Sequence, residues 1–426
     1  VLYAAILVLP LVVAGLTGDA VEAPFLRQLG KSFALVAITI LALQSVLAGR
    51  LKAVCEQYGL DMVLRFHKSM AVLSLVLLLA HPILLSLSAG SWDLITSLNL
   101  PWYIIFGKVA LLLLVIQGVT SIWQRRLLDF QTWRVLHNVA PAILVLAFVH
   151  SWMAGGDLQA TPMRALWVVL FAIAVVAYSA HKFVGPISRK SNLWTVKSVS
   201  QETHDVYTLE LEPPAGSETL QYNPGQFQFL TLYRGDRYDG EEHPFTISSS
   251  PSSGPTHTST IKQSGDFTAT IGETEPGDRA MIQAPFGRFS YAINAPDDRY
   301  LFIAGGIGIT PLMAMLRHMR DEGADCEVTL LFGNKTEDDI VFRNELDAIE
   351  AGDAPNLSVV HVLSQEQWDG ETGYIGRDLI SRHVGDDLSG MSIYLCGPEA
   401  MMDTLIPELL DMNADQDRLY AERFWL

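Results

Sequence analysis

RFHKSMAVLSLVLLLAHPI (residues 65–83) and WRVLHNVAPAILVLAFVHS (residues 133–151) are two apolar stretches, each with a histidine near both ends. The spacing is 14 residues between His67 and His81 and 13 residues between His137 and His150. In helices with a rise of 1.5 Å per residue, each pair is separated by about 20 Å along the axis. Both spacings lie close to whole numbers of helical turns, so each pair is expected on one face of its helix.

Two such helices side by side present two facing pairs, His67 with His137 and His81 with His150. This arrangement is typical of two haems stacked across a bilayer, with each iron bound by one imidazole from each helix. A single histidine in an apolar helix is usually a hydrogen-bonded core residue, but ionisable groups are costly in membrane segments, so four matched histidines indicate function. Zinc is the rival metal, but its sites usually cluster His, Cys and carboxylates, and neither bracketed segment contains Cys, Asp or Glu. The sequence therefore predicts a di-haem membrane domain.

Charge divides the 426 residues into two parts. Residues 1–189 carry 13 basic and 7 acidic residues, whereas residues 190–426 carry 16 basic and 39 acidic residues, so the net charges are +6 and −23. The first part is expected to be a membrane domain and the second an acidic soluble domain. Such a charge disfavours nucleic acid as a partner of the second part. The three cysteines provide no disulfide framework.

Six apolar segments approach the roughly 20 residues that a helix needs to span a bilayer. They lie at about residues 1–17, 32–49, 67–88, 102–123, 135–153 and 164–184. Basic residues collect on one side, which the positive-inside rule assigns to the cytoplasm. The sixth segment ends there, so we expect a multi-pass protein of the cell's inner (plasma) membrane with a cytoplasmic acidic domain. Arg65, Lys108 and Arg164 are candidate partners for haem propionates, with snorkelling to the interface as the alternative.

The hydrophobic pattern changes after residue 190. Short alternating runs between residues 195 and 282, separated by turn residues, predict a small antiparallel β-barrel. Beyond Asp297, buried strands alternate with helices, which predicts a parallel α/β sheet. We therefore expect a six-helix transmembrane haem bundle at 1–189, an antiparallel β-barrel domain at 190–295 and an α/β parallel-sheet domain at 296–426.

A glycine-rich turn follows the first strand of the α/β part, with the sequence Gly305-Gly306-Ile307-Gly308-Ile309-Thr310-Pro311. Glycines allow the backbone to approach a pyrophosphate, Thr310 can cap the next helix, and Pro311 suits its first turn. The helix N-terminus then faces the phosphates. A later strand ends in Cys396-Gly397-Pro398, at the edge of the sheet where ligands bind in such folds.

Three further motifs lie in the β part: Pro224-Gly225-Gln226-Phe227, His243-Pro244-Phe245-Thr246 and Ser264-Gly265-Asp266-Phe267-Thr268. The third could form a second phosphate cradle of backbone N–H groups. In this order, and followed by the glycine-rich turn and Cys396-Gly397-Pro398, the motifs resemble the ferredoxin–NADP reductase superfamily over about residues 191–426. With the four-histidine part, the whole chain resembles the bacterial transmembrane flavocytochrome b family of NADPH oxidases and ferric reductases.

The resemblance implies FAD on the barrel and NAD(P)H on the α/β domain. It assigns FAD to Pro224, Gly225, Gln226, His243, Pro244, Phe245, Thr246, Lys262, Gly265, Phe267, Thr268 and a C-terminal aromatic that covers the flavin, Phe424 first and Trp425 second. It assigns NAD(P)H to Gly305, Gly306, Ile307, Gly308, Thr310, Pro311, Asn334, Lys335, Cys396, Gly397 and Pro398. His243 stands where soluble members have Arg, which leaves less positive charge for the FAD phosphates. Lys335 favours NADPH, whereas Glu337, Asp338 and Asp339 would repel its 2′-phosphate, so NADPH is only slightly preferred to NADH.

The implied function is transfer of electrons from cytoplasmic NAD(P)H through FAD and two b-type haems to dioxygen outside, which produces superoxide. A flavin is needed because a hydride carries two electrons and a haem iron accepts one. A ferric chelate is the alternative acceptor, but the short loops at 89–101 and 154–163 slightly favour dioxygen. Two other functions remain open. The chain could be a haem subunit that reduces a protein partner, or a transporter with a regulatory nucleotide domain. We expect no acid–base pair and no obligatory protein partner.

Overall fold

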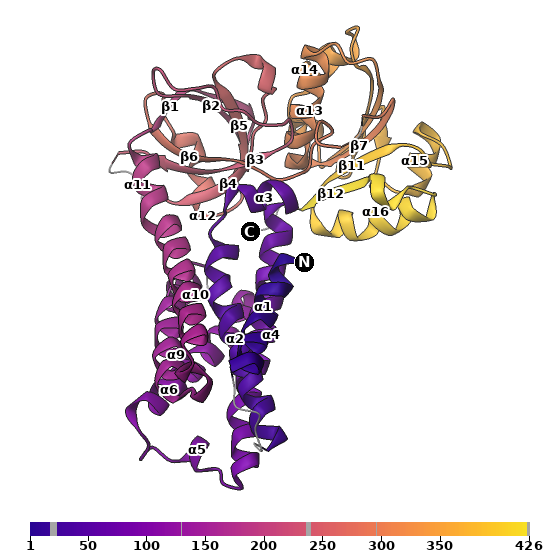
Figure 1. Ribbon diagram of the computed structural model, residues 1–426. Coiled ribbons are helices and arrows are strands. Elements are labelled where there is room, and N and C mark those ends of the chain that lie inside the picture. The colour runs from indigo at the N-terminus through magenta and orange to yellow at the C-terminus, as the bar shows by residue number, and fades with distance from the viewer. Residues whose placement is uncertain (18–23, 129, 236–239, 295, 424–426) are drawn as a thin grey trace. The chain divides into compact units, whose positions relative to one another are not determined.

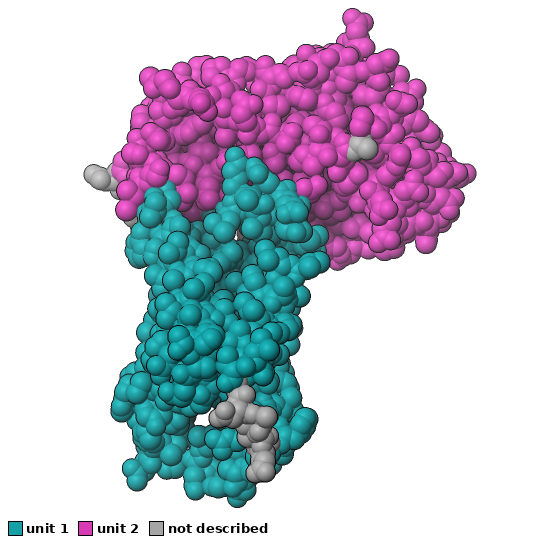
Figure 2. All heavy atoms as spheres, in the orientation of Figure 1, with its two compact units in different colours: residues 1–186 teal, residues 187–426 magenta. Residues whose placement is uncertain are grey.

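The computed structural model describes residues 1–17, 24–128, 130–235, 240–294 and 296–423. The chain divides into two compact units, Val1–Pro186 and Ile187–Leu426, which are coloured separately in Figure 2. The first unit contains only helices among its described residues, whereas the second contains both β-sheets (Figure 1).

The apolar segments of the first unit form helices, and five of them are long and apolar enough to cross a membrane: Phe25–Ala48, Leu60–Ala89, Trp102–Ile122, Thr132–Ala154 and Thr161–Lys190. The predicted span at residues 1–17 is not confirmed, because its helix has only 16 residues, about 24 Å at 1.5 Å per residue. The α-helices and the π-helical turn η2 are α1 Leu2–Thr17, α2 Phe25–Ala48, α3 Lys52–Tyr58, α4 Leu60–Ala89, α5 Asp93–Thr96, α6 Trp102–Ile122, α7 Gln124–Leu127, α8 Phe130–His137, α9 Ala140–Ala154, α10 Thr161–Ser179, η2 Ala180–Val184 and α11 Gly185–Lys190.

Helix packing brings α2 against α4 and α6 against α9, while α10 packs on α2. Gly30 permits the first of these contacts, since a Cβ there would lie 3.2 Å from Leu84 Cβ. Side chains such as Val76, Leu112 and Val176 stay exposed, which is expected of a surface that faces lipid rather than water. Large apolar side chains therefore lie on the outside of the bundle, and Gly30 allows α2 to approach α4 closely.

The segment that carries His137 and His150 is not one continuous helix. α8 ends at His137, residues 138–139 form a turn, and α9 begins at Ala140. Pro141 lies in the first turn of α9, where it supplies no N–H and disfavours helical geometry in the residue before it. The expectation of a single continuous helix is therefore wrong for this segment.

The first sheet of the second unit is antiparallel, with the order β4-β3-β6-β1-β2-β5. Its strands are β1 Trp194–Thr203, β2 Val206–Glu212, β3 Phe227–Tyr233, β4 Glu242–Thr246, β5 His257–Lys262 and β6 Arg279–Phe286. Among the described residues, β4 and β5 are the edges of this order and the strands do not close. The predicted barrel is therefore not confirmed, although the antiparallel sheet is.

The second sheet is parallel throughout, as predicted, with the order β10-β9-β8-β7-β11-β12. Alternate residues of β7 face opposite sides: Phe302 packs with α13 and α14, and Ile303 packs with α15 and α16. The elements are β7 Arg299–Gly305, α13 Ile309–Asp321, β8 Glu327–Asn334, α14 Arg343–Glu350, β9 Asn356–Leu363, β10 Glu371–Thr372, α15 Arg377–His383, β11 Ser392–Gly397, α16 Glu399–Asp411 and β12 Leu419–Arg423, with the short α12 Asp266–Ala269 before them.

Candidate cofactor sites

His67 and His137 face each other in the first unit, with their ring centres 6.3 Å apart and their planes at 61°. An ion bound at about 2.0–2.1 Å by one nitrogen of each imidazole would separate the ring centres by about 6 Å. Both side chains are partly buried. The pair that was predicted from spacing alone is thus brought together at a distance that fits a shared metal.

The second pair is oriented by the backbone. His81 Nδ1 lies 2.8 Å from the carbonyl oxygen of Gly30, and His150 Nδ1 lies 2.8 Å from that of Tyr103. A carbonyl oxygen can only accept, so Nδ1 of each ring donates and, in the neutral imidazole, Nε2 keeps its lone pair. Histidines that bind metals almost always show this second hydrogen bond, because it fixes the ring and its tautomer.

A cavity of about 550 Å³ is lined by His81 and His150 together with residues of α2, α4, α6, α9 and α10. This volume lies within the range of cofactor pockets. Arg27, Lys31 and Lys108 also line it. The walls therefore combine two oriented imidazoles, apolar surface and cations, which suits a haem with its propionates.

Of the three predicted cations, Lys108 lines this cavity, whereas Arg65 and Arg164 do not. Lys108 lines it and donates to the Ser97 carbonyl at 2.5 Å, whereas Arg65 pairs with Asp61 at an exposed position. Arg164 donates to the Leu158 carbonyl at 2.6 Å and is not among the cavity-lining residues. Arg27 and Lys31 were not predicted to line this cavity, because a charged residue next to an apolar segment is equally typical of the membrane interface.

Replacing Gly107 with alanine should displace the His150 ring. A Cβ at this position would lie 2.7 Å from His150 Nδ1, closer than side chains pack, and the crowded ring would lose its bond to Tyr103. If His150 binds haem, we expect a broadened or shifted haem absorption band and loss of part of the haem in the purified full-length protein. Gly15→Ala is the control, since a Cβ there meets nothing within 4 Å; normal spectra for both variants would contradict the prediction.

Gln117 of α6 contacts the first pair, with its Nε2 3.3 Å from His137 Nδ1. Its Oε1 is buried with no hydrogen-bond partner among the described residues. If His137 binds iron through Nε2, its Nδ1 carries the proton, and Gln117 then accepts this hydrogen bond through Oε1.

The predicted FAD residues of β4 and the 264–268 loop lie together. His243 stacks on Phe267 with ring centres 4.2 Å apart, and Phe245 lies 6.2 Å from Phe267. Pro244 and Thr246 occupy the same strand, and Thr246 Oγ1 is buried with no partner among the described residues. A buried hydroxyl without a partner is costly, so a ligand at this place fits the residues present.

The Pro224–Phe227 motif forms a tight turn. Gly225 has φ +93°, and a Cβ there would overlap the Phe289 carbonyl oxygen, so only glycine fits. Gln226 closes the turn by accepting from Asn223 N and donating to the Gly287 carbonyl, both at 2.8 Å. Gln226 is therefore placed as a structural residue of the motif.

In the predicted second phosphate cradle, residues 264–268, two backbone N–H groups are already hydrogen-bonded to the hydroxyl of Thr268. Thr268 Oγ1 accepts from the N–H groups of Ser264 and Gly265, both at 2.9 Å. A phosphate that used these two donors would have to displace Thr268. Lys262 pairs with Asp205 at 3.0 Å, so its charge is also partly compensated.

The two predicted NAD(P)H motifs meet at the carboxyl ends of β7 and β11. A Cβ on Gly308 would overlap the Cys396 carbonyl oxygen, and one on Gly305 would lie 2.8 Å from Pro398 Cδ. These glycines are thus required for the close approach of the turn to Cys396 and Gly397. Burial raises the pKa of Cys396, so its thiol stays protonated and is no nucleophile.

The remaining turn residues correct one prediction. Gly308, not Thr310, occupies the N-cap of α13, and the Thr310 hydroxyl donates to the Ile307 carbonyl at 3.0 Å. Pro311 lies in the first turn, as expected. Gly306 has φ +53° and open space around its Cα, so the tip of the turn is accessible to a ligand.

Asn334, at the end of β8, is 7% exposed, and both of its amide atoms are buried without partners among the described residues. Such a group fits a ligand that completes its hydrogen bonds. The adjacent Lys335 is exposed. Of the three nearby acids, Glu337 pairs with Arg343, and Asp339 accepts from the Thr336 N–H and hydroxyl. Two of the carboxylates that would repel a 2′-phosphate are therefore occupied.

The predicted flavin cover, Phe424 or Trp425, lies outside the described residues. β12 ends at Arg423, which is paired in register with Gly397. The C-terminal strand thus runs beside the strand that ends in Cys396-Gly397-Pro398.

Two family models match the chain. The ferric reductase like transmembrane component matches residues 33–148, and the oxidoreductase NAD-binding domain matches residues 302–405. The first range includes three of the four histidines, and the second includes both nucleotide motifs. Oxidoreductase and multi-pass membrane character are thus supported independently of the motifs.

Curated relatives match about half of the chain. Nitrate reductase [NADPH] of Emericella nidulans is 30% identical over 54% of this chain and 29% of its own length. The glycine betaine monooxygenase reductase subunit of Chromohalobacter salexigens is 31% identical over 55% of this chain and 64% of its own length. The chain therefore spans less than two thirds of either relative.

Among solved structures, the flavohaem-like FAD/NAD-binding domain of nitric oxide dioxygenase from Vibrio cholerae matches with a TM-score of 0.50 at 22% identity. The match covers 55% of this chain and 98% of that domain. This likeness concerns the fold, an antiparallel sheet followed by a parallel sheet.

Proposed function

Because the chain joins a ferric reductase-like transmembrane domain to a ferredoxin–NADP reductase-like domain, as NADPH oxidases and ferric reductases do, we propose that it is a superoxide-forming NAD(P)H oxidase. Electrons from NAD(P)H would cross the membrane to dioxygen. The observation that carries this proposal is the pairing of the four histidines, two of which are anchored to backbone carbonyls.

The residues divide into three binding tasks. The glycine-rich turn, Asn334 and the end of β11 would hold NAD(P)H, and the β4 motif with Phe267 would hold FAD. His67 with His137 and His81 with His150 would each hold one haem b. Bound FAD supplies the conversion from hydride to single electrons, and bis-histidine haem supplies one-electron transfer without an open position at iron.

The membrane orientation follows from charge. Basic residues between the apolar segments lie mainly on the side where the sixth segment ends, so the reductase domains belong in the cytoplasm of the inner-membrane protein. His81 and His150 would then lie nearer the outside, on the side of the acceptor.

Ferric-chelate reduction is the second candidate, and one observation favours it. Arg27, Lys31 and Lys108 line the cavity of the second histidine pair, and cations attract anionic chelates. Lys31 is already paired with Asp157 at 2.7 Å, however, and Lys108 with backbone carbonyls. The ion pair of Lys31 and the short outer loops leave dioxygen as the preferred acceptor.

The purified full-length protein, loaded with FAD and haem, should oxidise NAD(P)H and reduce cytochrome c in a reaction that superoxide dismutase abolishes. Running NADH and NADPH side by side also tests the preference for NADPH that Lys335 predicts. The same assay with a ferric chelate under nitrogen measures the second candidate. Cytochrome c reduction that is insensitive to the dismutase would exclude the oxidase, and a preparation without a haem absorption band would exclude both candidates.

A further inference from the structure

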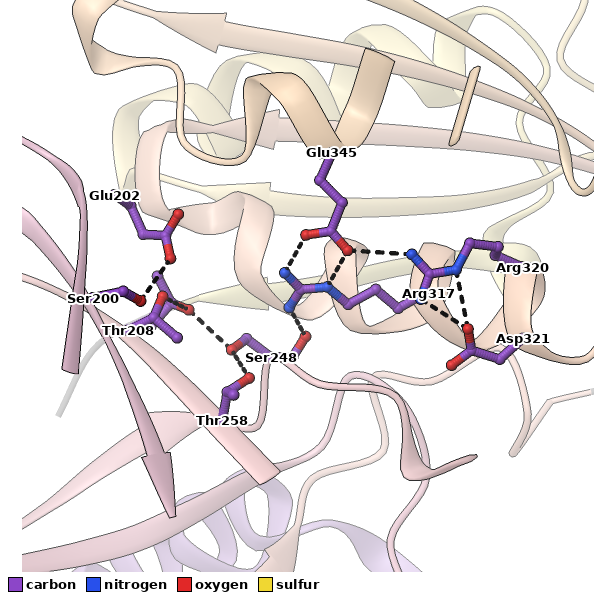
Figure 3. A network of polar contacts seen from close by, with 10 residues as sticks. Ser200, Glu202, Thr208, Ser248, Thr258, Arg317, Arg320, Asp321 and Glu345 are labelled. Atoms are coloured by element: carbon purple, nitrogen blue, oxygen red, sulfur yellow. Dashed lines mark hydrogen bonds and ion pairs between the residues drawn. The ribbon is translucent and has the colours of Figure 1, made fainter. Parts of the chain in front are cut away.

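Arg317, on α13, makes a three-point contact inside the second unit. Its Nε and Nη2 donate to the two carboxylate oxygens of Glu345 at 2.9 and 2.5 Å, and its Nη1 donates to the Ser248 carbonyl at 2.6 Å (Figure 3). Its guanidinium carbon lies 4.6 Å from the ring centre of Phe342. The side chain is 14% exposed, so water competes little for these contacts.

Glu345, on α14, fixes the orientation of this guanidinium. Burial alone would raise the pKa of Glu345, but the hydrogen bonds and charges of Arg317 and Arg320 outweigh it and hold the pKa below its ordinary value. The carboxylate therefore stays ionised at neutral pH. A bidentate arginine–carboxylate pair is both strong and directional. The third donor group of Arg317 is thereby aimed at Ser248.

Ser248 belongs to the antiparallel part and follows the predicted flavin motif by two residues, after Thr246. Its side chain is fully buried. The other flavin motif also contacts α13, since a Cβ on Gly225 would lie 2.6 Å from Met315 Cε. α13 therefore rests on both flavin motifs, once through Met315 and once through Arg317.

The N-terminus of the same helix carries the glycine-rich turn. Arg317 follows Thr310 by seven residues, which is about two turns or 10 Å along the axis. A tilt or slide of α13 against Ser248 would therefore move the turn that holds the nucleotide relative to the motif that holds the flavin. Hydride transfer is sensitive to such movement, since a displacement of about 1 Å can lower the rate about 100-fold.

We propose that Arg317 is a positioning residue for hydride transfer, which sets the approach of the nicotinamide to the flavin by fixing α13 on the Ser248 carbonyl. This inference rests on the proposed function, because it takes NAD(P)H and FAD as the two ligands. Arg317 acts through Ser248 and α13, and Glu345 acts by orienting Arg317.

The test is anaerobic single-turnover oxidation of NAD(P)H by the full-length, FAD- and haem-loaded protein. Arg317→Ala should lower the limiting rate about 10- to 100-fold while the apparent Kd of the nucleotide changes less than about 3-fold. The isotope effect with NAD(P)H deuterated at the transferred position should rise. Arg317→Lys, which keeps the charge, and Glu345→Gln, which keeps the shape, should each lose less.

Arg320→Ala is the matched control, because Arg320 is on the same helix and contacts Glu345 at 3.3 Å, whereas its hydrogen bonds among the described residues go to Asp321 and Glu345 and not to Ser248. If Arg320→Ala lowered the limiting rate as much as Arg317→Ala does, the proposal would be overturned. A limiting rate of Arg317→Ala within about 2-fold of wild type would also overturn it. If Arg317→Ala does not fold, the milder pair Arg317→Lys and Glu345→Gln decides, and normal rates in both would overturn it. Failure of the wild-type protein to oxidise either nucleotide would instead refute the proposed function.

Discussion

If His150 binds haem as proposed, its replacement with alanine should remove one of two haems and leave reduction of the flavin by NAD(P)H intact. The imidazole belongs to one of two oriented histidines that line the cavity of about 550 Å³, and an alanine there leaves His81 without an opposing imidazole. The flavin and nucleotide residues lie in the other compact unit, so their reaction should continue. The measurements are the haem-to-flavin ratio by haemochrome assay and anaerobic flavin reduction.

His81→Ala should reproduce this result, because both histidines would bind the same iron. His383→Ala is the control, since His383 lies outside the membrane unit and its Nε2 contacts Glu371 at 2.8 Å. An unchanged haem-to-flavin ratio in His150→Ala would show that the histidine pairs are not the ligands. Loss of flavin reduction in a folded variant would show that the two units do not work in series.

Replacing Gly308 with alanine should lower NAD(P)H oxidation by about 100-fold or more, the second large effect expected. The new Cβ would overlap the Cys396 carbonyl oxygen, so the glycine-rich turn would have to move away from the end of β11. Haem content and reduction of the haem by dithionite should stay normal, because both depend on the other unit. Steady-state oxidation of NADH and NADPH measures the loss.

The control for this variant is Gly323→Ala. Gly323 has a positive φ of +63°, whereas the φ of Gly308 is −60°, and a Cβ at Gly323 meets nothing within 4 Å. Gly323→Ala therefore introduces backbone strain of about 1–2 kcal/mol without any steric overlap, so it tests the effect of general destabilisation alone. Equal loss of activity in both variants would mean that general destabilisation, and not the close approach of the two motifs, explains the result.

The sequence predicted those features that depend on composition and local pattern. Five predicted spans correspond to long apolar helices, and the change from alternation to helix–strand repetition marked the two sheets. Histidine spacing identified two pairs that the structure brings together. These signals are local, because each arises within one helix or one strand and its turn.

The features that the sequence did not predict depend on partners far apart in the chain. Arg317 and Ser248 are 69 residues apart and share no motif, and the contact of Gly107 with His150 needs two packed helices. Pro141 could have indicated the helix break after His137, because proline is common in the first turn of a helix. The continuous apolar run favoured one helix instead. Closure of a barrel depends on whether the two edge strands of the sheet pair with each other. The alternation of apolar and polar residues within a strand does not show this.

The bonds from His81 and His150 to backbone carbonyls have an evolutionary consequence. A main-chain oxygen is present whatever amino acid occupies the position, so residue 103 can change its side chain freely without losing the acceptor. Adding or deleting one residue upstream in α2 or α6 is different, because it rotates every later carbonyl by about 100° about the helix axis. Homologues should therefore tolerate substitution at residue 103, but not at Gly30, where a Cβ would lie 3.2 Å from Leu84 Cβ, and should keep the lengths of these two helices constant.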